Sequence, residues 1–309
     1  TKNDPRLPGV KNAKAVVINL KTGFGTNPRS GQAQPPRFLG GSEPKLATSG
    51  IDRREAYIGW LTSRDNPFFA RSLVNRVWSY FFHRGIIDPV DDLRSTNPAI
   101  NPKLLDALTA DLVASGFDMR HLMRTIVSSR TYQRSSVANN SNIHDDMNFS
   151  RFVPRRLPAE TLLDCLVQAT GIPEKFSGAP VGFTAKQLPD ANIQSDFLKL
   201  FGKPQRMEAC ECERDSGANM LQALHFINGQ SILSRVSAGN GRVAGLVKSE
   251  KQIDRLVERL YIWSLCRRPT SKEQAVAVKF FGSYGDKRQE AAQDFMWALL
   301  NSREFMLVH

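Results

Sequence analysis

The cysteines offer the most unusual chemistry in this sequence. Cys210 and Cys212 lie two residues apart, so on an extended segment both thiols point to the same side. They could ligate a soft metal ion such as Zn²⁺, with the imidazole of His225 as a further donor. They could also form a disulfide with each other, or pair separately with Cys165 and Cys266. The sequence has no Cys-x-x-Cys pair, so these alternatives stay open and no cofactor is predicted for this chain.

Three carboxylates are candidates for acid–base catalysis: Asp92, Glu160 and Asp164. Asp92 ends an acidic loop at 88–92, and the other two lie one turn apart on one face of a predicted helix. Paired carboxylates hydrolyse glycosidic bonds, although the two groups usually come from different elements of the fold. A structural role is the alternative, because Arg94 is near enough in sequence to neutralise an aspartate of the loop.

Basic and amide side chains supply the candidate binding residues. Arg71 and Asn75 are four residues apart, so they share one face of a predicted helix that also carries Arg76. A guanidinium can bind a carboxylate or a phosphate through two hydrogen bonds. The alternative is a structural arginine that bonds backbone carbonyls or pairs with an aspartate of the 88–92 loop. The full set of candidate binding residues is Arg71, Asn75, Arg76, Arg155, Arg156, Arg214 and His225.

Helices must position most of these side chains, because apolar residues recur at helical spacing along most of the chain. Asn66 and Asn101, each followed by proline, are typical of helix starts. The predicted helices cover residues 52–63, 68–82, 101–116, 158–171, 196–201, 252–265 and 289–301, and three more begin near 118, 215 and 270. The segments 135–150 and 172–192 are rich in turn formers, so we expect loops there.

Two of the later helices carry more detailed signals. Thr270, with a glutamate three residues on, predicts a capping box. The helix capped by Asp215 or Ser216 is expected to turn Met220, Leu224 and Ile227 inward, because these residues recur at helical spacing.

The first 50 residues differ in composition from the rest. They are rich in Gly, Pro, Ser, Asn and Lys, and the run Ala15–Leu20 could form a strand. We therefore expect a mainly α fold, an irregular multi-helix bundle with a short β ribbon and an extended arm at the N-terminus. The expected domains are a basic arm over 1–50 and a single helical domain over 51–309, with a sub-division near residue 150.

Charge is unevenly distributed along the 309 residues, which carry 42 Lys and Arg against 30 Asp and Glu, a net charge of +12. Residues 1–50 have eight basic and two acidic side chains, and residues 231–309 have 13 and eight, so the surplus lies at the two ends. An anionic glycan or an acidic protein is expected to meet these ends, unless they are simply a solvated surface. No recognised nucleic-acid motif is present, so nucleic acid is not an expected partner.

Several function classes lack their sequence signals. No apolar run approaches the roughly 18 residues that span a bilayer, so no membrane span is expected. The Gly-x-Ser-x-Gly, Walker and dinucleotide-binding patterns are absent. Whether the chain is an enzyme stays open.

Several strings, taken together, resemble one known family. They are NPFFAR at 66–71, VNRVW at 74–78, GIIDPVDD at 85–92, SSRTYQ at 128–133, FGKP at 201–204, CECER at 210–214, QALH at 222–225 and NSREF at 301–305. The chain resembles, over residues 35–309, the C-terminal domain of unknown function (family fifteen fifty-three) of large secreted proteins from Planctomycetes and related bacteria. Lys203 is a departure, since arginine is expected there.

The resemblance implies a setting rather than an activity. Family members usually follow a signal peptide and a companion domain, and many carry a cytochrome c-like domain earlier in the chain. The resemblance therefore implies a C-terminal piece of a secreted, periplasmic or cell-surface protein. Its partner would be the N-terminal companion domain of the same protein, and haem would sit elsewhere in the full-length protein. No catalytic residues follow from the resemblance.

Three functions follow as hypotheses. The first is a binding or scaffold domain of a cell-envelope protein. The second is an enzyme that acts on extracellular acidic or sulfated polysaccharide. The third is a redox-linked or metal-binding module that uses Cys210, Cys212 and His225 and works with a cytochrome c domain.

Overall fold

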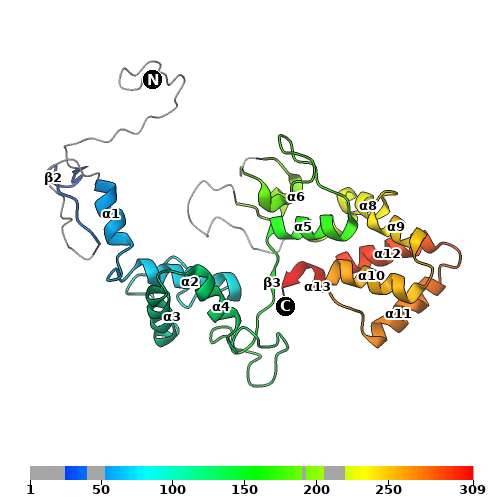
Figure 1. Cartoon of the computed structure of the whole chain (residues 1–309), viewed down its shortest axis with the longest axis horizontal. Coiled ribbons are helices and arrows are strands. Elements are labelled where there is room, and N and C mark those ends of the chain that lie inside the picture. Colours follow the sequence, from blue (N-terminus) through cyan, green and yellow to red (C-terminus); the bar gives the residue numbers. More distant parts are fainter. Residues whose placement is uncertain (1–24, 40–52, 190–192, 205–219, 309) are drawn as a thin grey trace, which may run out of the picture. The chain divides into compact units, whose positions relative to one another are not determined.

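The computed structural model describes residues 25–39, 53–189, 193–204 and 220–308 (Figure 1). Helices make up most of these segments, and the strands form two small two-stranded sheets. The prediction of a mainly α fold is therefore confirmed. The chain divides into two compact units, one of Thr1–Val77 with Asn101–Arg124 and one of Trp78–Ile100 with Thr125–His309. The predicted boundaries at residues 50 and 150 stay a prediction.

The first unit holds a β ribbon and helices. Strands β1 (Gly25–Thr26) and β2 (Ala33–Gln34) pair antiparallel, with Gly25 opposite Gln34. The helices are α1 (Arg53–Leu61) and α3 (Pro102–Ala114), and α2 (Phe69–Phe82) and α4 (Met119–Val127) cross the boundary between the units. A ribbon is therefore present near the N-terminus, whereas the strand predicted at Ala15–Leu20 lies outside the described residues.

Side-chain caps precede α2 and α3 where the sequence predicts them. The Asn66 carboxamide oxygen accepts hydrogen bonds from the backbone N–H groups of Phe68 and Phe69, both at 2.9 Å. Asn101 caps α3 through the Leu104 N–H at 3.1 Å. These bonds satisfy N–H groups that have no partner within the helix, so the predicted starts are confirmed.

The end of α2 differs from expectation. Glycine at position 85 marks the end of the apolar stripe in the sequence, but the helix ends at Phe82. His83 then takes the left-handed conformation, with φ of 64°. Few residues other than glycine and asparagine adopt it without cost, so the surrounding structure must hold His83 there.

The second unit is a helical body with a small sheet. Its elements are β3 (Arg155–Arg156), α5 (Ala159–Thr170), the 3₁₀ helix η1 (Ala185–Gln187), α6 (Asp196–Leu200), α7 (Met220–Asn228), α8 (Gln230–Ser237), α9 (Arg242–Ser249), α10 (Ile253–Leu265), α11 (Ser271–Gly282), α12 (Arg288–Leu300), α13 (Arg303–Met306) and β4 (Leu307–Val308). Strand β3 pairs antiparallel with β4, which joins the start of this helical body to its end.

Apolar side chains from several of these helices form one core. Its fully buried members include Leu163 and Leu166 of α5, Leu256 and Leu260 of α10, and Met296 of α12. Leu163 and Leu166, and likewise Leu256 and Leu260, recur at helical spacing, so one face of α5 and one face of α10 are buried.

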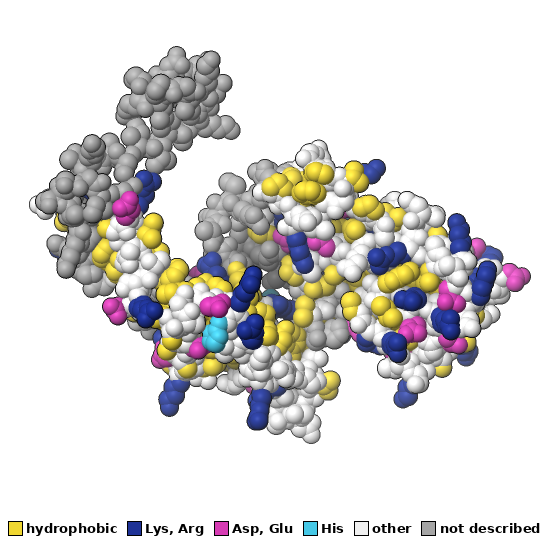
Figure 2. All heavy atoms as spheres, in the orientation of Figure 1, with side chains coloured by type: hydrophobic (Ala, Val, Ile, Leu, Met, Phe, Trp, Pro, Cys, Tyr) yellow, Lys and Arg dark blue, Asp and Glu magenta, His cyan; other side chains and the backbone are white. Residues whose placement is uncertain are grey.

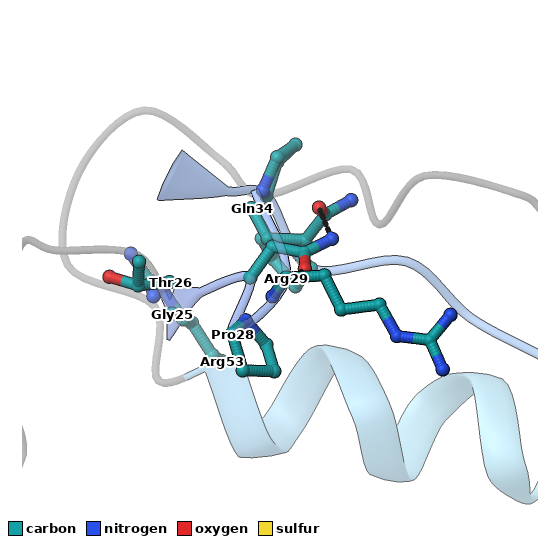
Figure 3. A pocket seen from close by; sticks show the side chains of 9 residues that line it. Gly25, Thr26, Pro28, Arg29, Gln34 and Arg53 are labelled. Carbon is teal, nitrogen blue, oxygen red and sulfur yellow. Dashed lines mark hydrogen bonds between the residues drawn. The ribbon is translucent and has the colours of Figure 1, made fainter. Parts of the chain in front are cut away.

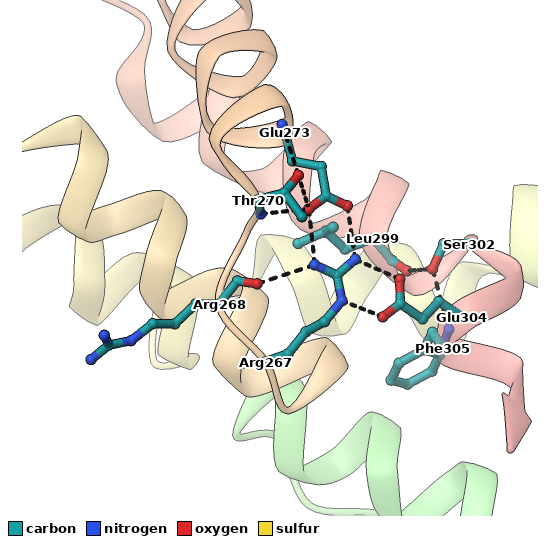
Figure 4. A network of polar contacts seen from close by, with 8 residues as sticks. All are labelled: Arg267, Arg268, Thr270, Glu273, Leu299, Ser302, Glu304 and Phe305. Carbon is teal, nitrogen blue, oxygen red and sulfur yellow. Dashed lines mark hydrogen bonds and ion pairs between the residues drawn. The ribbon is translucent and has the colours of Figure 1, made fainter. Parts of the chain in front are cut away.

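A polar network holds the end of the chain to the helical body (Figure 4). The Arg267 guanidinium donates to Glu273 at 2.7 and 2.9 Å and to Glu304 at 2.8 Å. Thr270 and Glu273 form the predicted capping box of α11. The bonds from Arg267 lower the pKa of Glu273 to about 2. This network therefore joins the α10–α11 turn to α13.

The surface of this body mixes both signs of charge. Over helices α10 to α12, the face in Figure 2 shows basic side chains interspersed with acidic ones. On this face the basic surplus of residues 231–309 therefore forms no continuous patch. None of the helices described is long and apolar enough to cross a bilayer.

Candidate functional site

Helix α7 has an unusual distribution of buried and exposed side chains. Gln222 and Phe226 are 3% and 1% exposed, whereas Met220, Leu221 and Leu224 are 77%, 64% and 46% exposed. Ile227 is 46% exposed as well. The prediction that Met220, Leu224 and Ile227 face inward is therefore wrong, because the opposite side of the helix is buried.

Hydrogen bonds to Gln222 give the physical reason for this orientation. Arg156 Nη1 donates to the carboxamide oxygen of Gln222, and the Gln222 amide donates to the Leu200 carbonyl at 2.9 Å. One turn on, the Phe226 ring packs edge-on against Phe201, with centroids 5.5 Å apart. A buried amide with both partners costs little, and its helical neighbour fills the core. A pattern of apolar residues alone cannot show this, because Gln222 is polar.

The structure brings two of the predicted binding residues to α7. Arg156 bonds Gln222, and His225 lies on the same helix, with its Nε2 3.0 Å from Ser231 Oγ. The His225 ring also packs edge-on against Phe197, and burial lowers its pKa. His225 is therefore neutral near pH 7 and already bonded. Gln222 joins these predicted residues, and sequence reasoning did not choose it as a site residue.

A tight turn connects α7 to α8. Gly229 N–H donates to the His225 carbonyl at 2.8 Å, and a Cβ on Gly229 would come within 2.1 Å of that oxygen. Glycine is thus required there. On α8, Arg235 is buried and pairs with Glu174, which fixes this helix to the start of the segment that follows α5.

Exposed apolar side chains recur on both of these consecutive helices. We call this set of side chains the α7–α8 apolar surface, and it consists of Met220, Leu221, Leu224, Ile227 and Leu233. Single exposed apolar residues are normal on proteins, but a group of five on two helices in contact resembles an interaction surface.

The arginine before Arg156 has a different environment. Arg155 pairs with Val308 in the small sheet, and its Nε is buried without a hydrogen-bond partner among the described residues. Burial lowers the pKa of its guanidinium. Lys203 Nζ is also buried without a hydrogen bond in the described part of the chain.

The candidate catalytic carboxylates Asp92 and Asp164 already have partners. Asp92 pairs with the Arg94 guanidinium through two bonds of 2.6 Å, which lowers the pKa of Asp92. Asp164 accepts hydrogen bonds from the backbone N–H groups of Ala185, at 2.7 Å, and Lys186, at 3.4 Å, at the start of η1. Both carboxylates therefore have hydrogen-bond partners within the fold.

Glu160 lies in the first turn of α5, one turn before Asp164. A carboxylate there is favoured by the helix dipole. Whether Asp92, Glu160 or Asp164 is catalytic stays a prediction.

In the first unit, Arg71 pairs with Asp106 of α3. Its partner in this ion pair is thus not an aspartate of the 88–92 loop. Asn75, on the same helix, is fully buried, and Arg76 is partly exposed. A buried amide on α2 is typical of a structural role.

Two of the four cysteines lie outside the described residues. Cys210, Cys212 and Arg214 are not among them. Cys165 and Cys266 are free thiols, and burial raises the pKa of Cys165. Within the described segments, no three His, Cys, Asp or Glu side chains are grouped to hold a metal ion. The metal and disulfide alternatives for Cys210 and Cys212 stay predictions.

An open hollow of about 620 Å³ lies beside the β ribbon of the first unit (Figure 3). Arg29 and Arg53 are among the residues that line it, with Pro28 and Gln34. Its two arginines agree in sign with the basic N-terminal segment of the sequence. Binding of an anion at that end stays a prediction.

Comparison with known proteins places this chain in a family. The family model described as PSD1, protein of unknown function (DUF1553), matches residues 53–281. No curated protein and no solved structure matches the chain. The matched range includes α7 and α8, together with Arg156 and Glu174, which bond to them. Since the match covers most of the length of this chain, the chain belongs to the PSD1 family of proteins of unknown function (DUF1553).

Proposed function

We propose that this chain is a binding module of a secreted or cell-envelope protein, and that it docks the companion domain of that protein. The α7–α8 apolar surface carries this proposal. Four of its five side chains come from one helix of nine residues, and all are at least 40% exposed. Covering a Leu, Ile or Met side chain fully is worth about 1.5–3 kcal/mol, so a partner with a matching apolar face would gain from each one.

The helices that carry this surface are also fixed in the unbound chain. Gln222 and Phe226 anchor the inner side of α7, and Trp297 Nε1 donates to the Ile227 carbonyl at 3.3 Å. Arg235 anchors α8. A surface that is already ordered loses little conformational entropy on binding, which favours affinity.

The alternative hypotheses have weaker support in the described residues. The enzyme hypothesis needs free carboxylates, but Asp92 is paired with Arg94 and Asp164 is bonded to the start of η1. The redox-linked hypothesis depends on Cys210 and Cys212, about which the described residues carry no information. Docking therefore remains the function that the geometry supports best.

Calorimetry with the separately expressed companion domain tests the proposal. Binding should be saturable, and Leu221→Asp and Leu224→Asp should each weaken it at least tenfold, because a charge would be buried in the interface. Val276→Asp is the matched control, since Val276 is an equally exposed apolar residue, at 68%, on α11. Circular dichroism confirms that each variant is folded. Absence of binding by the wild-type chain, or equal loss with Val276→Asp, would contradict the proposal.

A further inference from the structure

A second feature of the helical unit is a cavity of about 310 Å³ that is lined by both charged and apolar side chains. It lies between the end of α2, the turn at Asp88 and the segment 145–153. Its lining residues include His83, Arg84, Asp88, Asp146, Phe149 and Arg151. This volume is at the lower end of the range for small-ligand sites, which suits a single small polar molecule.

Two guanidinium groups in this cavity are held in place by backbone carbonyls. Arg84 Nη1 donates to the Asp146 carbonyl at 3.0 Å, and Arg151 Nε donates to the Asn142 carbonyl at 3.3 Å. Neutral carbonyls fix the two groups without cancelling their charges. Arg84 Nε is buried and has no hydrogen-bond partner among the described residues. Each guanidinium has five N–H donors, so donors are left for a ligand.

The carboxylates of the cavity compensate these charges only loosely. Asp88 Oδ2 lies 3.5 Å from Arg84 Nε, and Asp146 Oδ1 lies 3.9 Å from Arg151 Nη2. Both distances exceed those of a charge-assisted hydrogen bond. Asp145 is different, because it accepts hydrogen bonds from the backbone N–H groups that follow it, at 2.8 and 3.0 Å. Asp88 and Asp146 therefore remain available as acceptors for hydroxyl groups.

His83 adds a group that can both donate and accept. Its imidazole makes no hydrogen bond within the described part of the chain, and its backbone is held at a positive φ. Burial lowers the pKa of His83, the charge of Arg155 lowers it further, and Asp88 opposes both. A neutral imidazole offers one N–H donor and one nitrogen acceptor.

An aromatic ring completes the wall. The Phe149 ring lies 5.3 Å from Phe82 and 5.3 Å from Trp78, each in an edge-on arrangement. Phe149 is partly exposed and lines the cavity. The cavity thus combines fixed cations, hydroxyl acceptors and an apolar face within one small volume.

We propose that this cavity binds a uronic acid, a sugar that carries one carboxylate and several hydroxyl groups. The carboxylate lies against the guanidinium groups of Arg84 and Arg151, where planar groups match in shape. Hydroxyl groups donate to Asp88 and Asp146, and the C–H face of the ring lies on Phe149. The site uses no residue of the α7–α8 apolar surface, so its test is independent of the docking test.

Isothermal titration of the purified chain with sodium D-glucuronate tests the proposal. Glucuronate should bind saturably at one site, whereas D-glucose, which lacks the carboxylate, should not bind measurably. Sodium sulfate, which supplies charge without hydroxyl groups, should bind at least tenfold more weakly than glucuronate. Arg84→Gln and Arg151→Gln should each weaken glucuronate at least tenfold, about 1.4 kcal/mol.

Two further variants keep the test decisive. Arg94→Gln is the matched control, because Arg94 pairs with Asp92 and does not line the cavity. His83→Asn removes the imidazole while asparagine tolerates the positive φ, so glucuronate should bind several-fold more weakly with an unchanged thermal midpoint. No saturable binding of glucuronate would overturn the proposal. Equal affinity for glucose or sulfate would overturn it too, as would unchanged affinity in folded Arg84→Gln, Arg151→Gln and His83→Asn.

Discussion

Gln222 is a polar side chain on the buried side of a helix that is otherwise mostly apolar. Its oxygen accepts from Arg156 and its amide donates to the Leu200 carbonyl, so the amide loses little on burial. Turning α7 by half a turn would bury more apolar surface but would leave these groups without partners. The orientation of α7 therefore depends on this single residue together with Phe226.

Gln222→Leu should lower the free energy of unfolding by about 1–3 kcal/mol, because the Arg156 guanidinium and the Leu200 carbonyl each lose a hydrogen bond. Urea denaturation monitored by circular dichroism measures this change. Gln230→Leu, at an exposed glutamine on the next helix, is the control and should change little. If the two variants are equally stable, Gln222 does not set the orientation of α7.

Glu273 predicts a pH dependence at the other end of this unit. Arg267 lowers its pKa from 4.5 to about 2, so the unfolded chain binds the proton more readily than the folded chain. The resulting stability is present above pH 4.5 and is lost as the pH falls toward 2. Urea denaturation between pH 5 and pH 2.5 should therefore show a smaller loss in Glu273→Gln than in the wild-type chain. Glu290→Gln, at an exposed position, should follow the wild type. Parallel curves for all three proteins would exclude this role for Glu273.

The candidate site residues show where sequence reasoning stops at this scale. Arg156 and His225 could be chosen from their residue types, and the structure brings both to α7. His83 could not, because the cavity that it lines is completed by the 145–153 segment, some sixty residues away. The spacing of residues near His83 does not indicate this cavity. The sequence of the 135–150 segment indicates only an exposed polar loop.

At the scale of elements, helices with both a cap and an apolar stripe could be predicted closely. Helix α3, capped by Asn101, and α11, capped by Thr270, begin where predicted. The short helices α8 and α9 were not predicted. Both follow a glycine and have no side-chain cap, so they lack the local signals that mark a start. Tertiary packing, rather than local sequence, stabilises such helices.

Two substitutions on α7 compare how much its buried side and its exposed side contribute to stability. Phe226→Ala should lower the free energy of unfolding by about 3–5 kcal/mol, because it leaves a cavity in the core. Leu224→Asp should change it by about 0.5 kcal/mol or less, because Leu224 is 46% exposed and its loss opens no cavity. Thermal and urea denaturation measure both. A larger effect for Leu224→Asp would show that this residue is packed in solution.

At the scale of the whole molecule, the end of the chain stabilises the helical unit. Strand β4 pairs with β3, Phe305 is buried in the core, and Glu304 bonds Arg267. These contacts join residues far apart in the sequence, and only the helix ending near 301 was predicted there.

Removal of residues 301–309 should therefore lower the free energy of unfolding by about 4 kcal/mol or more, since burial of Phe305 alone is worth about 3–5 kcal/mol. Arg303→Ala, an exposed position of the same segment, is the control and should cost about 0.5 kcal/mol or less. Differential scanning calorimetry measures both. A truncated chain as stable as the wild type would contradict the role assigned to α13 and β4.

Oxidative footprinting of the complex tests the central claim most directly, because it reports which side chains a partner covers. Met220, Leu221 and Leu224 should be oxidised several-fold more slowly when the companion domain is present at saturation. Val276 of α11 is exposed outside the proposed interface, so its oxidation rate should stay the same. If Met220 and Leu221 are oxidised equally fast in the free chain and in the saturated complex, the α7–α8 apolar surface is not the docking surface.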